Sequence, residues 1–105
     1  MVSKHYKNQR SKREEFIDEH FGDGHIIDEF IVDRGHPHGV ERHCIMDNGV
    51  IVIYNVVSGK LITKLLARPY QIKRYYESSD KEPPEEYEKI LELAHLHNVL
   101  GYNHI

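Results

Sequence analysis

Apolar and polar positions change their spacing along the chain and divide it into three parts. Between Ser3 and Phe21, apolar residues are sparse until Phe16, and a break with two glycines follows. This pattern predicts an N-terminal helix. The next segment, HIIDEFIVD, is rich in Ile, Phe and Val. It predicts a strand that ends at a glycine- and proline-containing loop over residues 35–39.

Two short turns connect three further apolar segments. The segments ERHCIMD and VIVIYN flank Asn48-Gly49. This pair is preferred in two-residue type I′ hairpins, because both central residues need positive φ. A second hairpin is predicted through Ser58-Gly59 into KLITKLLA. The pattern therefore predicts three consecutive antiparallel strands near residues 40–47, 50–56 and 60–67.

Two helices are predicted after the strands. Pro69 is favoured in the first turn of a helix, so PYQIKRYYES is predicted to form a short helix after Arg68. The sequence Glu82-Pro83-Pro84 interrupts this helix. From Glu85 onward, apolar residues follow helical spacing, which predicts a C-terminal helix that ends near Gly101.

Size and composition agree with a single α+β domain of 105 residues. We expect an N-terminal helical segment (1–24), an antiparallel four-stranded meander (25–67) and two C-terminal helices (68–105). The single cysteine, Cys44, excludes an intramolecular disulfide and a cysteine-based zinc cage. No apolar run resembles a signal peptide or a membrane span. We therefore expect a cytoplasmic protein with no membrane partner.

The net charge of −3 conceals an uneven distribution. Residues 34–76 contain seven Lys and Arg but two Asp and Glu, whereas residues 77–105 contain seven acidic and two basic residues. A basic face can contact phosphates, and an acidic helix can contact a protein partner, although such a helical face is more often simply solvated. The distribution is thus more informative than the total charge.

The register of the hairpins decides which polar side chains meet on the sheet. A two-residue first turn would place His43 opposite Tyr54, and a two-residue second turn would place Tyr54 opposite Thr63. A three-residue second turn would instead place Lys64 opposite Tyr54 and turn Thr63 to the other face. Arg68 would share the face of Lys64 if the strand continued that far.

Either register suits cleavage of a phosphodiester. His43 would be the general base or acid that acts on a 2′-hydroxyl. Tyr54, with Thr63 or Lys64 according to register, would orient the phosphate, and Arg68 would help hold it. These five residues are the candidate catalytic set. Tyrosine and threonine are also ordinary strand residues, and a strand histidine more often only packs or forms hydrogen bonds.

Basic and aromatic residues are interleaved in the segment ITKLLARPYQIKRYY. Cations can hold a phosphate backbone, and aromatic rings can stack on unpaired bases, which makes RNA or single-stranded nucleic acid a candidate partner. The alternative, which we favour slightly, is an amphipathic helix with Ile72 and Tyr76 in the core and its charges solvated. The candidate nucleic-acid contacts are Lys64, Arg68, Tyr70, Lys73, Arg74 and Tyr75.

Histidines suggest a weaker hypothesis. His36-Pro37-His38 and His43-Cys44 place several metal-ligand types in one loop and strand. Zinc usually needs three or four protein ligands, and nine histidines in a short chain make chance clustering common. We therefore expect polar, partly exposed histidines with no metal and no other cofactor.

Residues 33–76, DRGHPHGVERHCIMDNGVIVIYNVVSGKLITKLLARPYQIKRYY, resemble small proteins of phages and prophages. This resemblance implies a phage accessory or early-expressed protein, which would be located in the cytoplasm of the host cell. More distantly, a helix followed by a four-stranded meander looks like the barnase-, colicin- and RelE-like ribonucleases, which commonly use His, Thr, Tyr, Arg or Lys on the sheet face. That resemblance implies such roles for His43, Thr63, Lys64 and Arg68.

Two functional hypotheses follow from the sequence. The first is a small phage-type accessory protein that binds nucleic acid and that, in the enzymatic version of the hypothesis, is a metal-independent ribonuclease. The alternative is a non-enzymatic module that binds and modulates a host or phage protein, through its acidic C-terminal helix.

Overall fold

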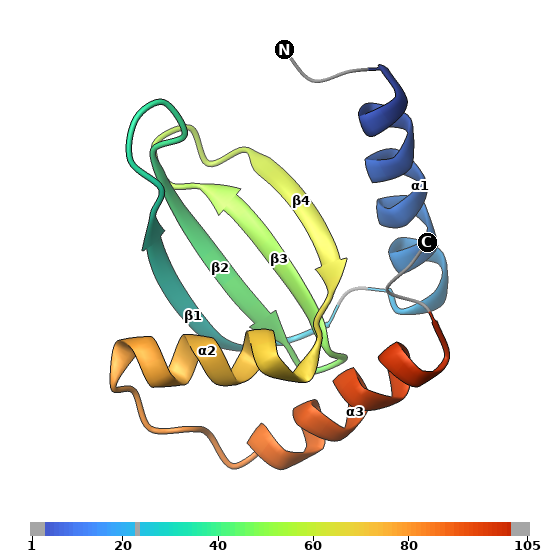
Figure 1. The fold of residues 1–105 in the computed structure, drawn as a ribbon, viewed down its shortest axis with the longest axis vertical. Coiled ribbons are helices and arrows are strands. Elements are labelled where there is room, and N and C mark those ends of the chain that lie inside the picture. The colour runs from blue at the N-terminus through green and yellow to red at the C-terminus, as the bar shows by residue number, and fades with distance from the viewer. Residues whose placement is uncertain (1–3, 23, 102–105) are drawn as a thin grey trace.

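The computed structural model describes residues 4–22 and 24–101, with side chains in the first helix described from Lys12 onward. It contains one helix, a four-stranded antiparallel sheet and two further helices, which confirms the predicted α+β class (Figure 1). Each predicted element is present, with ends that differ by one or two residues. The elements are α1 (Lys4–His20), β1 (Ile26–Asp33), β2 (Val40–Met46), β3 (Val50–Asn55), β4 (Leu61–Leu66), α2 (Pro69–Ser79) and α3 (Tyr87–Val99).

The strands follow one another across the sheet in the order β1-β2-β3-β4, the predicted meander. Helices cover both faces of this sheet. Because alternate residues of a strand point to opposite faces, the continuous apolar run VIVI of β3 is buried on both sides. Ile72 and Tyr76 of α2 face the core, as the amphipathic interpretation of α2 predicts. The larger core comprises Phe30, Ile45, Ile51, Ile53, Ala67, Ile72, Tyr76, Ile90 and Ala94, and the smaller one Ile17, Cys44, Val50, Val52 and Leu66.

The first hairpin does not have the predicted two-residue turn. The Gly49 amide donates to the Met46 carbonyl over 3.2 Å, and Gly49 has φ +81° whereas Asn48 is not in the left-handed region. Three residues therefore connect the strands, as in a type I turn followed by a left-handed glycine. The Asn48 side chain accepts from the Val50 amide (3.1 Å), which satisfies the turn locally.

This turn shifts each cross-strand pair of β2 and β3 by one residue. His43 lies opposite Ile53, and Arg42 lies opposite Tyr54. The predicted pair of His43 and Tyr54 is therefore wrong, and their side chains point to opposite faces of the sheet.

The second hairpin has a longer turn than either alternative predicted. The Asn55 amide donates to the Lys60 carbonyl over 2.9 Å, which leaves residues 56–59 as a four-residue loop. A register shift also lies between Ile53 and Tyr54.

The longer loop and the register shift together change the partners of β4. Thr63 lies opposite Ile53 and Lys64 opposite Val52, so the prediction that either lies opposite Tyr54 is wrong. The loop length depends on Asn55, which lies before the predicted Ser58-Gly59 turn. The Asn55 side chain accepts from the Ser58 amide (2.9 Å), and this bond orders a loop that is two residues longer than Ser58-Gly59 alone.

Among residues 4–22 and 24–101, no helix combines the length and the apolar character needed to cross a bilayer.

Candidate functional site

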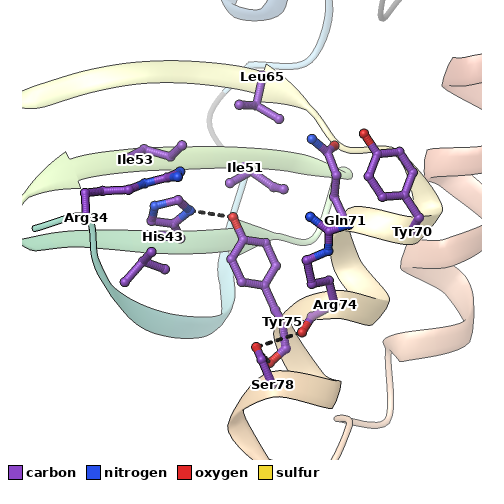
Figure 2. A pocket seen from close by; sticks show the side chains of 11 residues that line it. Arg34, His43, Ile51, Ile53, Leu65, Tyr70, Gln71, Arg74, Tyr75 and Ser78 are labelled. Carbon is purple, nitrogen blue, oxygen red and sulfur yellow. Dashed lines mark hydrogen bonds between the residues drawn. The ribbon is translucent and has the colours of Figure 1, made fainter. Parts of the chain in front are cut away.

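A cleft of about 340 Å³ lies between α2 and the face of the sheet that α2 covers (Figure 2). The strands supply an apolar floor, and α2 and the loop after β1 supply mostly polar groups at the rim. The lining residues are Val32, Arg34, His43, Ile51, Ile53, Leu65, Tyr70, Gln71, Arg74, Tyr75 and Ser78.

A chain of hydrogen bonds lies at the inner wall of this cleft. Glu41 and His43 are two residues apart on β2, so their side chains share one face. Nε2 of His43 lies 2.9 Å from Oε1 of Glu41, and Nδ1 is hydrogen-bonded to the Tyr75 hydroxyl. Figure 2 shows the ring of His43 and the hydroxyl of Tyr75 pointing toward one another. This series of hydrogen bonds connects β2 to α2.

Arg34 extends this chain to the solvent. Its Nε donates to the Glu41 carboxylate over 3.0 Å, and its side chain is 52% exposed whereas that of Glu41 is 12% exposed. Burial raises the pKa of Glu41, but hydrogen bonds from His43 and Arg34 and their charges outweigh it, so the pKa lies below the ordinary value of 4.5. Glu41 is therefore an anion at neutral pH.

The negative charge of Glu41 determines which groups in this series of hydrogen bonds carry the protons. An ionised carboxylate only accepts, so in the uncharged form of the His43 ring Nε2 carries the proton, which it donates to Glu41. Nδ1 is then the acceptor, and the Tyr75 hydroxyl donates to it. Burial raises the pKa of Tyr75 to about 12, which keeps the phenol protonated. The arrangement can carry a proton from the Tyr75 oxygen to His43 next to a fixed negative charge.

The packing of α2 on β1 holds Tyr75 in this position. The ring of Tyr75 stacks on Phe30 with centroids 5.0 Å apart, and Tyr76 contacts the same Phe30 ring edge-on. The Tyr76 hydroxyl donates to Asp28 over 3.0 Å, and Lys81 forms an ion pair with Asp28. The contact between α2 and β1 is therefore held by apolar packing at Phe30 and by polar bonds at Asp28.

A second arginine lies at the outer rim. Tyr70 and Arg74 are four residues apart on α2 and thus share a helical face, and the Arg74 guanidinium lies 5.7 Å from the Tyr70 ring centroid. Tyr70 is 53% exposed. Within the described part of the chain Arg74 forms no ion pair. The cleft thus has guanidinium groups from two separate elements.

Four of the residues predicted from the sequence line this cleft: His43, Tyr70, Arg74 and Tyr75. Tyr54 does not, because it lies on the opposite face with the Arg42 guanidinium 5.2 Å from its ring centroid. Thr63 is not a lining residue either, and its hydroxyl accepts from Arg13 of α1 over 2.7 Å. The predicted row of His43, Tyr54 and Thr63 therefore does not form.

The other three predicted cations also lie outside the cleft. Lys64 forms an ion pair with Asp18 of α1 over 2.7 Å. Arg68 precedes α2, where its backbone amide donates to the Gln71 side chain (2.8 Å). Lys73 is exposed on α2 but does not line the cleft.

The sequence-based prediction missed four polar residues that contribute to the site: Arg34, Glu41, Gln71 and Ser78. The signal for Glu41 was present, since residues two apart on a strand share a face and one of them was His43. Nothing in the local sequence indicates that Arg34 reaches Glu41 or that Tyr75 reaches His43.

The metal-ligand types in the sequence do not come together. His36 and His38 are exposed in the loop between β1 and β2, and Cys44 is buried in the core on the opposite face from His43. Among the described residues there is no group of three or more His, Cys, Asp or Glu that could hold a metal ion.

Comparison with known proteins adds no further information on the site: no family model, no curated protein and no solved structure matches this chain.

Proposed function

We propose that the cleft binds single-stranded RNA and cleaves it without a metal ion, with Tyr75 and His43 as the acid–base pair. The observation that supports this most is the Glu41–His43–Tyr75 chain of hydrogen bonds in a cleft that also contains Arg34 and Arg74. A carboxylate, an imidazole and a phenol in this order form a proton relay, and guanidinium groups bind phosphate.

Binding rests on the rim of the cleft. A guanidinium presents its N–H groups in a planar fork that matches two phosphate oxygens, so Arg34 and Arg74 can hold one phosphate or two successive ones. The exposed ring of Tyr70, next to Arg74, offers a surface on which an unpaired base stacks. This combination favours a single strand, because paired bases have no free face.

The relay acts on the 2′-hydroxyl of the bound RNA. The 2′-oxygen attacks the phosphorus while its proton passes to the Tyr75 oxygen, and the Tyr75 proton passes to Nδ1 of His43. Glu41 stabilises the imidazolium that forms. The bond from phosphorus to the 5′-oxygen breaks, and this oxygen takes a proton from water. The hydroxide that remains takes the proton back from His43 through Tyr75, which returns the relay to its starting form. The products are a 2′,3′-cyclic phosphate and a 5′-hydroxyl, and the arginines stabilise the charge that develops on the phosphate oxygens.

Tyr75 rather than His43 is the group that contacts the substrate. His43 is only 2% exposed, so a ribose has little access to its ring. Tyr75 is partly exposed and lines the cleft. Because burial raises its pKa to about 12, Tyr75 is protonated at neutral pH and takes part in the relay by exchanging one proton for another.

The test uses labelled RNA and DNA strands of one sequence, incubated with the protein in EDTA. We expect cleavage of the RNA alone, because DNA lacks the 2′-hydroxyl. Tyr75→Phe should reduce the rate by about 100-fold or more, since it removes the relayed proton and little else. Tyr54→Phe is the matched control on the opposite face and should be neutral. Cleavage of the DNA, or full activity of Tyr75→Phe, would contradict the mechanism.

A second candidate function is binding to a host or phage protein, and the surface of α3 favours it. Glu88 and Glu92 are exposed, as are Leu96 (49%) and Val99 (66%) near its C-terminal end. An acidic face with apolar side chains suits a protein partner. In this case we expect a stoichiometric complex and no cleavage. Such a complex should depend little on salt, whereas binding of RNA should weaken steeply between low and physiological ionic strength.

A further inference from the structure

The two edges of the sheet differ. At β4, α1 packs along the edge, and Nε of Arg13 donates to the backbone carbonyl of Lys64 over 3.1 Å. At the other edge, β1 pairs only with β2, and no described helix or strand lies beyond it (Figure 1). An uncovered edge presents unpaired backbone N–H and C=O groups to which another strand can bind.

The hydrogen bonds show which backbone groups of β1 point outward. The Glu29 carbonyl accepts from Lys81 over 3.1 Å, so it points away from β2. Backbone direction alternates along an antiparallel strand, so the N–H and C=O groups of Ile31 and Asp33 point outward too. The cross-strand partner of Asp33 is Val40, whose carbonyl accepts from the Val56 amide just after β3 and so points away from β1. This agrees with an outward direction for the backbone groups of Asp33. Four backbone groups are thus open, and Lys81 ends the open segment at Glu29.

The side chains along this edge have a regular pattern. Glu29, Ile31 and Asp33 are two residues apart and share the face that α2 does not cover, because Phe30 between them is buried against α2. Ile31 is 65% exposed. A hollow of about 440 Å³ lies at this edge, bordered by residues 29–32 of β1 on one side and by Tyr75, Ser78, Ser79 and Lys81 at and just beyond the C-terminal end of α2 on the other.

We propose that this edge binds an extended segment of a partner protein as a fifth, antiparallel strand, with the side-chain pattern basic–x–apolar–x–basic. Its backbone would bond to Ile31 and Asp33, its apolar residue would lie beside Ile31, and its basic residues would lie opposite Glu29 and Asp33. Opposite charges directly across two strands stabilise the pair. Addition of a strand to an edge is a common mode of peptide recognition.

The charges disfavour a second copy of this chain in the same place. If two β1 strands paired antiparallel with Ile31 opposite Ile31, Glu29 of each copy would lie opposite Asp33 of the other. Like charges directly across strands are destabilising. The same two carboxylates therefore repel another β1 and attract a basic strand.

The probe is a fluorescein-labelled peptide with the sequence KTVTK between serines, and binding is measured by fluorescence anisotropy. A peptide with ETVTE and one with KKTTV are the controls, the second with the same composition but a broken alternation. We expect KTVTK to bind at least about tenfold more tightly than either control. Equal binding of KTVTK and KKTTV would overturn the proposal, because it would show attraction by charge alone.

Two variants locate the peptide on β1. Ile31→Pro removes an outward N–H but no bond to β2, so the sheet should remain and the affinity should fall roughly tenfold. Ile31→Val keeps the N–H and should bind normally. Glu29→Lys should weaken KTVTK and favour ETVTE, and it tests the same edge if the proline variant does not fold. Unchanged affinity in Glu29→Lys would overturn the proposal. So would a dimer in light scattering that Ile31→Pro abolishes, because the edge would then bind a second copy.

Discussion

At the scale of residues, Glu41 connects His43 and Arg34, two residues that line the cleft. It accepts from His43 and from Arg34 through the same oxygen, 2.9 Å and 3.0 Å away. The carboxylate thereby sets the tautomer of His43, which in turn makes Tyr75 a donor. Removal of this one charge should change which groups of His43 and Tyr75 donate and which accept, while both side chains remain in the site.

The lowered pKa of Glu41 predicts a pH-dependent stability. A carboxyl whose pKa is lower in the folded than in the unfolded state contributes stability above the unfolded value, and this contribution is lost as pH falls through the folded value. For Glu41 the loss begins near its ordinary pKa of 4.5 and continues below it. We expect Glu41→Gln to cost about 1–3 kcal/mol at pH 7, and less than that at pH 3, in urea denaturation. An equal cost at both pH values would show that the charge of Glu41 contributes nothing.

At the scale of elements, the hairpin between β2 and β3 connects the sheet to α3. Gly49 is buried in its turn, and the ring of His97 on α3 packs against it. The Gly49 carbonyl also accepts from the Ala67 amide that follows β4 over 3.0 Å. The three-residue turn, which sets the register of β2 and β3, is therefore also a contact surface for α3.

Gly49 and Gly59 allow this contact to be measured. Both have positive φ, +81° and +71°, but a Cβ on Gly49 would lie 3.1 Å from Cε1 of His97, and one on Gly59 would contact nothing. We expect Gly59→Ala to cost about 1 kcal/mol from backbone strain alone. Gly49→Ala should cost roughly 1–3 kcal/mol more, because α3 must also move. Equal costs in thermal or denaturant unfolding would mean that α3 accommodates the methyl group freely.

At the scale of the whole molecule, the basic segment of the sequence does not produce one basic face. Lys64 pairs with α1, Arg42 lies over Tyr54 on the same side of the sheet as α1, and Arg74 lies at the cleft on the other side. The strand alternation and the two-sided sheet distribute the charges in this way. Binding of RNA should therefore depend on a few cations at the cleft and not on the sum of the charges.

The salt dependence of RNA binding tests this distribution. Each phosphate contact on a single strand contributes about −0.7 to the slope of log K against log salt concentration. Arg74→Ala should make the slope shallower by about this amount. Lys73→Ala removes a positive charge from the next position on α2, outside the cleft, and should leave the slope unchanged. Equal effects of the two variants in filter-binding titrations would indicate a diffuse contact and contradict the cleft as the binding site.

The sequence by itself determined the elements and their order. The predicted helices and strands depend on local preferences that act within a few residues. These local signals are the changes in periodicity, Pro69, the Glu82-Pro83-Pro84 break and the glycines. The same is true of Ile72 and Tyr76, whose helical spacing placed them in the core. Consecutive strands joined by short turns usually pair with each other, so the meander was also predicted from the sequence.

Only the tertiary structure decided the register and the site. Hairpin turns of two and of three residues are both common. In this structure the side chain of Asn48 also donates to the distant Phe21 carbonyl (3.3 Å), a contact that the local sequence does not indicate. One residue of register moved Tyr54 to the other face. The pair of His43 and Tyr75 joins residues 32 apart in sequence, and it forms because the packing of α2 on Phe30 brings them together. No local preference encodes that approach.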